Sequence, residues 1–192
     1  FYLFNLFGGT DNDGVLQRIF LPMAPEYMGY AEQGLEENLF VSRRPKIELR
    51  DGGQFKYRLD SSSDTAPQNI AAVCVSRPTN PTGNVLTASE LDSLSDLARE
   101  RDIPLIIDNA YGTPFPDIIF GDARPVFNEQ TIVCMSLSKL GMPGLRTGIV
   151  VASEGITEAL GAMNAVVSLA ANSMGPAVAQ ELFESGEVVR IS

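Results

Sequence analysis

Short, almost wholly apolar runs that end in polar turns are the feature of this sequence that most constrains its fold. The clearest runs are residues 70–76 (IAAVCVS), 103–108 (IPLIID), 131–137 (TIVCMSL) and 147–153 (TGIVVAS). A strand with one solvent-exposed face alternates apolar and polar residues, whereas an unbroken apolar run is typical of a strand that is buried on both faces. We therefore expect these runs to form a mainly parallel sheet between two layers of helices.

The segments between the runs supply the helices. Thr87 followed by Glu90 is a capping-box signature, and it predicts a helix of about 14 residues. Its apolar face would carry Leu91, Leu94, Leu97 and Ala98. Other helical patterns cover residues 1–7, 154–168 and 175–185, residues 15–23 add a strand, and residues 29–60 mix a short helix with alternating segments. Together they predict one α/β domain, a three-layer open, mostly parallel sheet with helices on both faces.

The charge of the chain argues against some partners. Its 192 residues carry 14 Lys and Arg against 24 Asp and Glu, a net charge of −10, which disfavours a surface that tracks the phosphates of a nucleic acid. No apolar run reaches the roughly 18 residues that a membrane helix needs. We therefore expect a cytoplasmic protein with no nucleic-acid or membrane partner.

The chain contains no histidine. This removes the Ser-His-Asp and Cys-His nucleophile systems and the usual zinc and non-haem iron sites. Cys74 and Cys134 lie inside apolar runs without CxxC spacing, so we expect buried, reduced thiols and no metal site. Any chemistry must then come from lysine, tyrosine, carboxylates or a cofactor.

Polar side chains directly follow three of the apolar runs. The strand ending at Ser76 continues into RPTNPTGN, the strand ending at Asp108 into NAYG, and the strand ending at Ser136 into LSKLGMPGLR. Taken singly, each cluster also fits a structural turn or a helix cap. In open α/β sheets, however, ligands bind at the carboxyl ends of the strands, so the three ends together predict one site that combines an amine, a carboxylate, a guanidinium, an amide, a phenol and hydroxyls.

That combination matches the needs of pyridoxal 5'-phosphate (PLP). A primary amine must form the Schiff base with the cofactor aldehyde, which fits Lys139, and a carboxylate must keep the pyridine nitrogen protonated, which fits Asp108. The phosphate needs a guanidinium and hydroxyls in a Gly-rich loop, and the ring oxygen needs two donors. The candidates are Ser136, Ser138 and Arg146 for the phosphate, and Asn80 and Tyr111 for the ring oxygen.

Three strings, SRPTNPTGN, IIDNAYG and SLSKLGMPGLRTG, closely resemble the fold type I PLP enzymes of the aspartate aminotransferase superfamily in sequence and in order. A further string, LPMAPEYMGYAEQGLEE, is similar to the valine–pyruvate aminotransferase branch. The resemblance covers essentially the whole chain, as the large, cofactor-binding domain (residues 1–192). It implies an enzyme that moves an amino group between a small aliphatic amino acid, such as valine or alanine, and a 2-oxo acid such as pyruvate.

The resemblance also implies roles for single residues. Lys139 would be the Schiff-base lysine and proton shuttle, Asp108 the partner of the pyridine nitrogen, and Tyr27 the aromatic ring stacked on the cofactor. Asn80, Tyr111, Ser136, Ser138 and Arg146 would keep the contacts given above. A phosphate-binding loop before the first helix and a small domain after Ser192 would lie outside this sequence, and the full-length enzyme would be a homodimer. The resemblance therefore implies that this fragment alone would fold but turn over slowly or not at all.

Two other functions fit the same sequence. A carbon–sulfur β-lyase would keep the fold and the cofactor but eliminate a β substituent, and it would release pyruvate from cysteine conjugates. An effector-sensing domain of a transcription regulator would keep the cofactor lysine without turnover. Such regulators carry a DNA-binding module, for which this sequence shows no sign.

Overall fold

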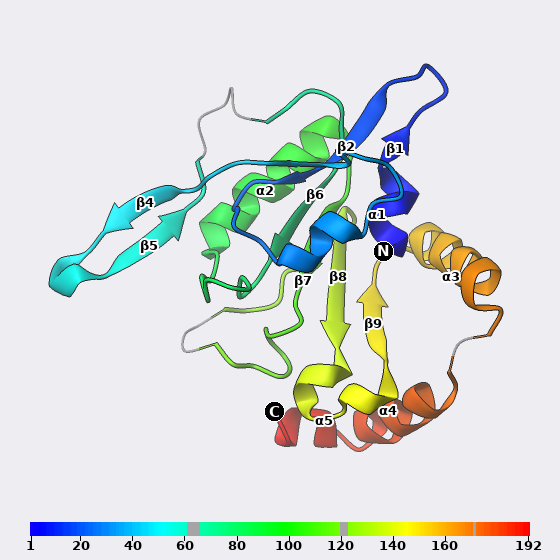
Figure 1. The fold of residues 1–192 in the computed structure, drawn as a ribbon. Helices are drawn as coiled ribbons and strands as arrows, with labels where there is room; N and C mark the ends of the chain where they lie inside the picture. The colour runs from blue at the N-terminus through cyan, green and yellow to red at the C-terminus, as the bar shows by residue number, and fades with distance from the viewer. Residues whose placement is uncertain (61–65, 120–122, 171) are drawn as a thin grey trace.

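The computed structural model describes residues 1–60, 66–119, 123–170 and 172–192. Among these residues, seven strands form the main sheet, in the order β1-β2-β6-β7-β8-β9 with β3 also paired to β2 (Figure 1). Their bounds are β1 (Gly9–Thr10), β2 (Leu16–Leu21), β3 (Phe40–Ser42), β6 (Ile70–Ser76), β7 (Leu105–Asp108), β8 (Thr131–Ser136) and β9 (Gly148–Val151). The pairs β2·β3, β2·β6, β6·β7 and β7·β8 are parallel, and β1·β2 and β8·β9 are antiparallel. The predicted mostly parallel α/β sheet is confirmed.

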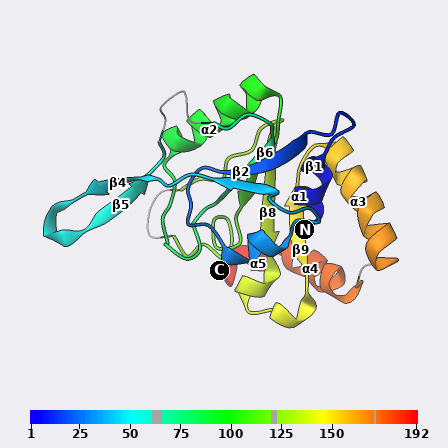
Figure 2. The ribbon, with the colours of Figure 1, turned by 45° about the horizontal axis from the view of Figure 1, so that its top comes forward.

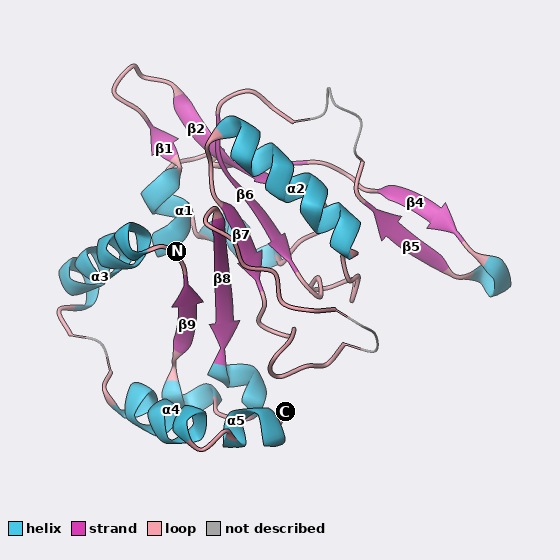
Figure 3. Ribbon diagram, turned by 180° about the vertical axis from the view of Figure 1, so that it is seen from behind, coloured by secondary structure: helices cyan, strands magenta, loops and turns pink. Residues whose placement is uncertain are grey.

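Helices cover both faces of this sheet. The α-helices are α1 (Tyr2–Phe7), α2 (Ala88–Arg101), α3 (Glu154–Ser168), α4 (Met174–Glu184) and α5 (Glu187–Arg190), and the 3-10 helices used below are η1 (Met28–Glu32), η4 (Leu137–Leu140) and η5 (Pro143–Leu145). α2 packs on one face, while α1 and α3 lie on the opposite face (Figures 1 and 3). The three predicted layers are therefore present.

The core alternates along each central strand. In β6, Val73 and Val75 face the apolar cluster under α2, whereas Ala72 and Cys74 face the cluster under α1 and α3. β7 repeats the pattern, because Leu105 and Ile107 join the first cluster and Ile106 the second. Successive side chains of a strand point to opposite faces, so an unbroken apolar run is what both faces of these strands require.

The predicted capping box starts α2. The Thr87 hydroxyl accepts a hydrogen bond from the Glu90 N–H at 3.3 Å, and the Glu90 carboxylate accepts one from the Thr87 N–H at 2.8 Å. Two of the unpaired donors at the helix start are thereby satisfied, and such a cap stabilises a protein by about 1 kcal/mol. The helix ends at Arg101, and the C-cap residue Asp102 adopts left-handed backbone angles.

The prediction that residues 147–153 are buried on both faces is wrong. β9 lies at the end of the described sheet, and Val150 and Val151 are 38% and 39% exposed. It also runs antiparallel to β8. A parallel crossover needs a dozen or more residues, usually with a helix, whereas the connection here contains only the short turns η4 and η5. The chain therefore reverses direction after β8, and β9 pairs with it in the antiparallel sense.

Residues 46–58 form a separate hairpin that projects from the body of the molecule (Figure 2). Its strands are β4 (Lys46–Leu49) and β5 (Phe55–Arg58). One face carries Ile47, Leu49 and Phe55, which are largely exposed. Among the helices of the described residues, none has the length and apolar character needed to cross a membrane.

Candidate active site

The carboxyl ends of β6, β7 and β8 meet at a cavity of about 260 Å³. Because these strands are parallel, the polar residues that follow them lie at one edge of the sheet. The lining residues are Tyr27, Ser76, Pro78, Asn80, Asp108, Ala110, Tyr111, Ser136, Ser138, Lys139 and Arg146. The structure thus brings together all eight residues that the sequence singled out for the cofactor site.

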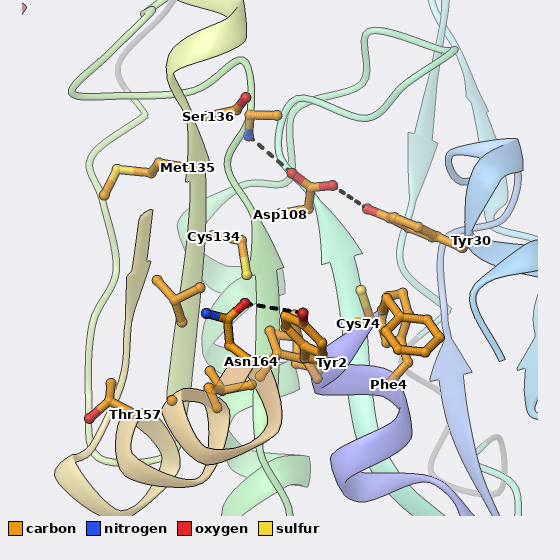
Figure 4. A pocket seen from close by; sticks show the side chains of 17 residues that line it. Tyr2, Phe4, Tyr30, Cys74, Asp108, Cys134, Met135, Ser136, Thr157 and Asn164 are labelled. Carbon is orange, nitrogen blue, oxygen red and sulfur yellow. Dashed lines mark hydrogen bonds between the residues drawn. The ribbon is translucent and has the colours of Figure 1, made fainter. Parts of the chain in front are cut away.

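Asp108 ends β7 with its carboxylate held on two sides. Its Oδ2 accepts a hydrogen bond from the Tyr30 hydroxyl at 2.5 Å, and its Oδ1 accepts one from the Ala110 N–H at 3.1 Å (Figure 4). Burial raises the pKa of Tyr30, and the nearby groups Cys74 and Asp108 raise it further. Tyr30 therefore stays protonated, and its hydroxyl donates the hydrogen bond that holds the Asp108 carboxylate in place. Tyr30 is not among the site residues predicted from the sequence.

The turn after β8 places Lys139 next to Tyr111. Lys139 lies in η4, and its Nζ is 4.9 Å from the centroid of the Tyr111 ring. A cation at this distance from an aromatic ring is attracted by the ring's negative face. The amine predicted to bind the cofactor and the phenol predicted to bind its ring oxygen are therefore neighbours.

Three residues of the predicted phosphate cup are linked by hydrogen bonds. The Ser138 N–H donates to Ser136 Oγ at 3.2 Å, and Arg146 Nη1 donates to Ser138 Oγ at 3.4 Å. Arg146 has a φ of 47°, in the left-handed region that non-glycine residues rarely adopt. Such backbone outliers gather at ligand sites, and here the outlier is a cation that lines the cavity.

Asn80 and Tyr27 complete the lining from two loops. Asn80 lies in a turn that is closed by the Gly83 N–H, which donates to the Thr79 carbonyl at 2.7 Å. Gly83 has a φ of +68°, which favours glycine at this position of the turn. Tyr27 is 47% exposed and packs edge-on against the Tyr30 ring, with 5.6 Å between ring centroids. Its ring is free to contact a ligand.

A second, larger cavity of about 660 Å³ adjoins the first. It lies between α1, α3 and the sheet, and it shares Asp108, Ala110 and Ser136 with the smaller cavity (Figure 4). Most of its lining is apolar and includes Cys74 and Cys134. Burial raises the pKa of both thiols, that of Cys134 to about 12, so neither is a ready nucleophile. The groups that suit PLP line the smaller cavity, which we take as the active site.

Comparison with known proteins agrees with this geometry. The family model for aminotransferases of class I and II matches residues 47–189. The chain belongs to this family. It is 53% identical over its whole length to the valine–pyruvate aminotransferase of Escherichia coli K12 and covers 46% of that protein.

Solved structures of aminotransferases have the same fold. The valine–pyruvate aminotransferase of Salmonella typhimurium superposes with a TM-score of 0.88 and 49% identity, over 99% of this chain and 47% of that one. A Thermus thermophilus aspartate aminotransferase variant reaches a TM-score of 0.75 at 20% identity, over 98% and 47%, which shows the shared fold alone. The chain thus spans about half the length of these aminotransferases.

Replacing Tyr30 with phenylalanine tests the contact that holds Asp108. The ring packs edge-on against Phe4, with 5.3 Å between centroids, so we expect the fold to persist. A hydrogen bond to a charged group contributes about 1.5 to 3 kcal/mol, and urea unfolding should show a loss of roughly that size. Tyr2→Phe is the matched control, because within the described part of the chain the Tyr2 hydroxyl forms hydrogen bonds only with the neutral groups of Asn164 and Ser168. Equal losses in the two variants would show that Tyr30 does not hold a charged carboxylate.

Proposed function

We propose that this chain is the PLP-binding large domain of an aminotransferase that transfers an amino group between valine or alanine and pyruvate or a related 2-oxo acid. The observation that carries the proposal is the meeting of Lys139, Asp108 and Arg146 around one cavity at the strand ends. An amine, a carboxylate and a guanidinium are the groups that an aldehyde, a pyridine nitrogen and a phosphate require. The similarity to the E. coli enzyme supports the choice of substrates.

The lining of the cavity fits PLP group by group. Lys139 would hold the aldehyde carbon, and Asp108 would pair with the pyridine nitrogen. Tyr27 would cover the ring, Asn80 and Tyr111 would donate to its oxygen, and Ser136, Ser138 and Arg146 would hold the phosphate. The volume of about 260 Å³ lies just below the range of roughly 300–1,000 Å³ that is typical of small-molecule pockets.

The chemistry that PLP supplies when bound is an electron sink, which accepts the electron pair left when the α-carbon of an amino acid loses its proton. The chain must move that proton. Once the amine of the substrate has displaced Lys139 from the aldehyde carbon, the freed Nζ would take the proton from the α-carbon as general base and would give it back as general acid. Asp108, held by Tyr30, would keep the pyridine nitrogen protonated, so that the ring can accept the electron pair.

The partners and setting of the protein follow from the same proposal. The substrates are a small amino acid and a 2-oxo acid, and the complete enzyme is proposed to work as a homodimer. Cys74 and Cys134 are free thiols, which supports a reducing compartment, and we propose the cytoplasm.

A direct assay of product formation tests the reaction. Protein saturated with PLP is mixed with valine and pyruvate, and alanine formation is followed by chromatography. With the complete enzyme, we expect alanine and 2-oxoisovalerate to form in equal amounts, and leaving out either substrate should limit the reaction to at most one equivalent per active site. Release of pyruvate from a cysteine conjugate, without alanine formation from valine and pyruvate, would instead support a carbon–sulfur lyase.

A further inference from the structure

The segment between β2 and β3 presents three side chains to the ends of the central strands. Tyr27 lines the smaller cavity, and the Tyr30 hydroxyl donates to Asp108 on β7. The third side chain is Glu26, which is only 8% exposed and reaches Ser76 at the end of β6. Unlike the two tyrosines, Glu26 has no role in the site described so far.

Among the residues that the structure describes, the hydrogen bonds of Glu26 are all with Ser76. The Ser76 N–H lies 3.3 Å from each carboxylate oxygen of Glu26, and the Ser76 hydroxyl makes a short hydrogen bond with Oε2. Among the described residues, no lysine or arginine forms an ion pair with it. A buried carboxylate without a cation is costly, so its place here calls for an explanation.

The position of Ser76 supplies that explanation. Ser76 pairs with Asp108 in the register of β6 and β7, and both line the smaller cavity. Glu26 and Tyr30 therefore attach one short segment to two adjacent strand ends, and Tyr27 lies between these two attachments. Removing either attachment would free the ring of Tyr27 to move away from the cavity.

We propose that Glu26 is a positioning residue of the cofactor site, which through Ser76 fixes the segment that carries Tyr27 and Tyr30 over the ends of β6 and β7. This inference rests on the proposed function, because PLP is the ligand that Tyr27 and Asp108 would contact. Glu26 acts through these residues and does not itself line the cavity.

The electrostatics of Glu26 make the attachment sensitive to pH. Burial raises its pKa from 4.5 to about 7, the bonds from Ser76 oppose this shift, and the negative charge of Asp108 adds to it. The other titratable groups that face it are Cys74 on β6 and Tyr30 in η1, whose own pKa values are raised mainly by burial, so both are neutral. A folded-state pKa above the unfolded value gives stability that is fully present below pH 4.5 and is lost as the pH rises through 7.

Two substitutions separate the contact from the charge. In Glu26→Gln, the amide oxygen accepts from the Ser76 N–H and the amide N–H donates to the Ser76 hydroxyl, so the contact stays and the charge is removed. Glu26→Ala removes both. Glu37→Gln is the control for loss of one negative charge, since Glu37 is exposed.

The first measurement is the melting temperature of the protein without cofactor between pH 5 and pH 8. As the pH rises over this range, the wild type should lose stability relative to Glu26→Gln. The difference between their melting temperatures should change by about 5 °C or more. The melting temperature of Glu37→Gln should change with pH as that of the wild type does. If the melting temperature of Glu26→Gln also changes with pH as that of the wild type does, the claim that a buried Glu26 carboxyl group attaches the segment to Ser76 is overturned.

The second measurement is a fluorescence titration with PLP at pH 7. We expect Glu26→Ala to bind about tenfold more weakly, because ordering the freed segment then opposes binding, and Glu26→Gln to recover most of that loss. Wild-type affinity in Glu26→Ala would overturn the positioning role. A wild type that does not bind PLP at all would instead overturn the proposed function, while the melting series would still decide whether Glu26 anchors the segment.

Discussion

Replacing Lys139 with alanine should abolish the covalent attachment of PLP and leave the fold intact. Lys139 is exposed in a short turn, and its main contact is the Tyr111 ring. Loss of such a cation–π contact costs about 0.5 to 1 kcal/mol. After incubation with PLP, treatment with borohydride and gel filtration, the wild type should retain the cofactor absorbance and the variant should lose it. The far-ultraviolet circular dichroism of the two proteins should agree.

The other two lysines provide matched controls. Lys46 forms an ion pair with Asp60 at 2.7 Å, and Lys56 donates to the Val85 carbonyl at 2.7 Å. Burial lowers the pKa of Lys56, which makes its amine more reactive, so Lys56→Ala is the stricter control. Both control variants should keep the fixed chromophore. If the chromophore survives in Lys139→Ala and disappears in Lys56→Ala, then Lys56 binds the cofactor and our assignment of Lys139 is wrong.

Asparagine at position 108 should weaken PLP binding and slow its chemistry. The Tyr30 hydroxyl still has an oxygen to donate to, so the geometry should persist, but the negative charge opposite the pyridine nitrogen is gone. A charge-assisted hydrogen bond contributes about 1.5 to 3 kcal/mol, which corresponds to a loss of about 10- to 100-fold in affinity. The first conversion of bound cofactor by alanine should slow by about three orders of magnitude, because the charge acts mostly on the transition state.

The control for this change is Asp92→Asn, an exposed position on α2 with the same loss of charge. PLP titration and stopped-flow absorbance with alanine are run on the wild type and both variants. Asp92→Asn should match the wild type. If Asp108→Asn also binds and reacts as the wild type does, the carboxylate that faces the pyridine nitrogen lies elsewhere.

Local patterns predicted the elements of the fold well. The capping box at Thr87 and the apolar runs at 70–76 and 103–108 are decided by near neighbours in the chain and by burial on both faces. The run at 147–153 misled because apolar residues also occur in an edge strand, and its place in the sheet depends on the length of the connection before it. Periodicity contains no information on that connection.

The same reasoning explains which site residues were found. Asp108 ends one apolar run, Lys139 follows another, and Arg146 lies in the Gly/Pro-rich loop after the second, at the edge where the parallel strands end together. Glu26 and Tyr30 were missed because their partners lie 50 and 78 residues away. Those contacts exist only because β2 pairs with β6, which places the segment after β2 over the ends of β6 and β7. Their nearness to Tyr27 in the string APEYMGY was the one signal available.

Peptide mapping of the wild-type protein tests the central claim most directly. The sequence contains three lysines, Lys46, Lys56 and Lys139, and reduction with borohydride in the presence of PLP can mark their side-chain amines. After digestion, mass spectrometry should find the phosphopyridoxyl group on the peptide that contains Lys139, close to one per chain. A label on Lys46 or Lys56 in preference to Lys139, or no label on any of the three, would contradict the assignment of this cavity as a PLP site.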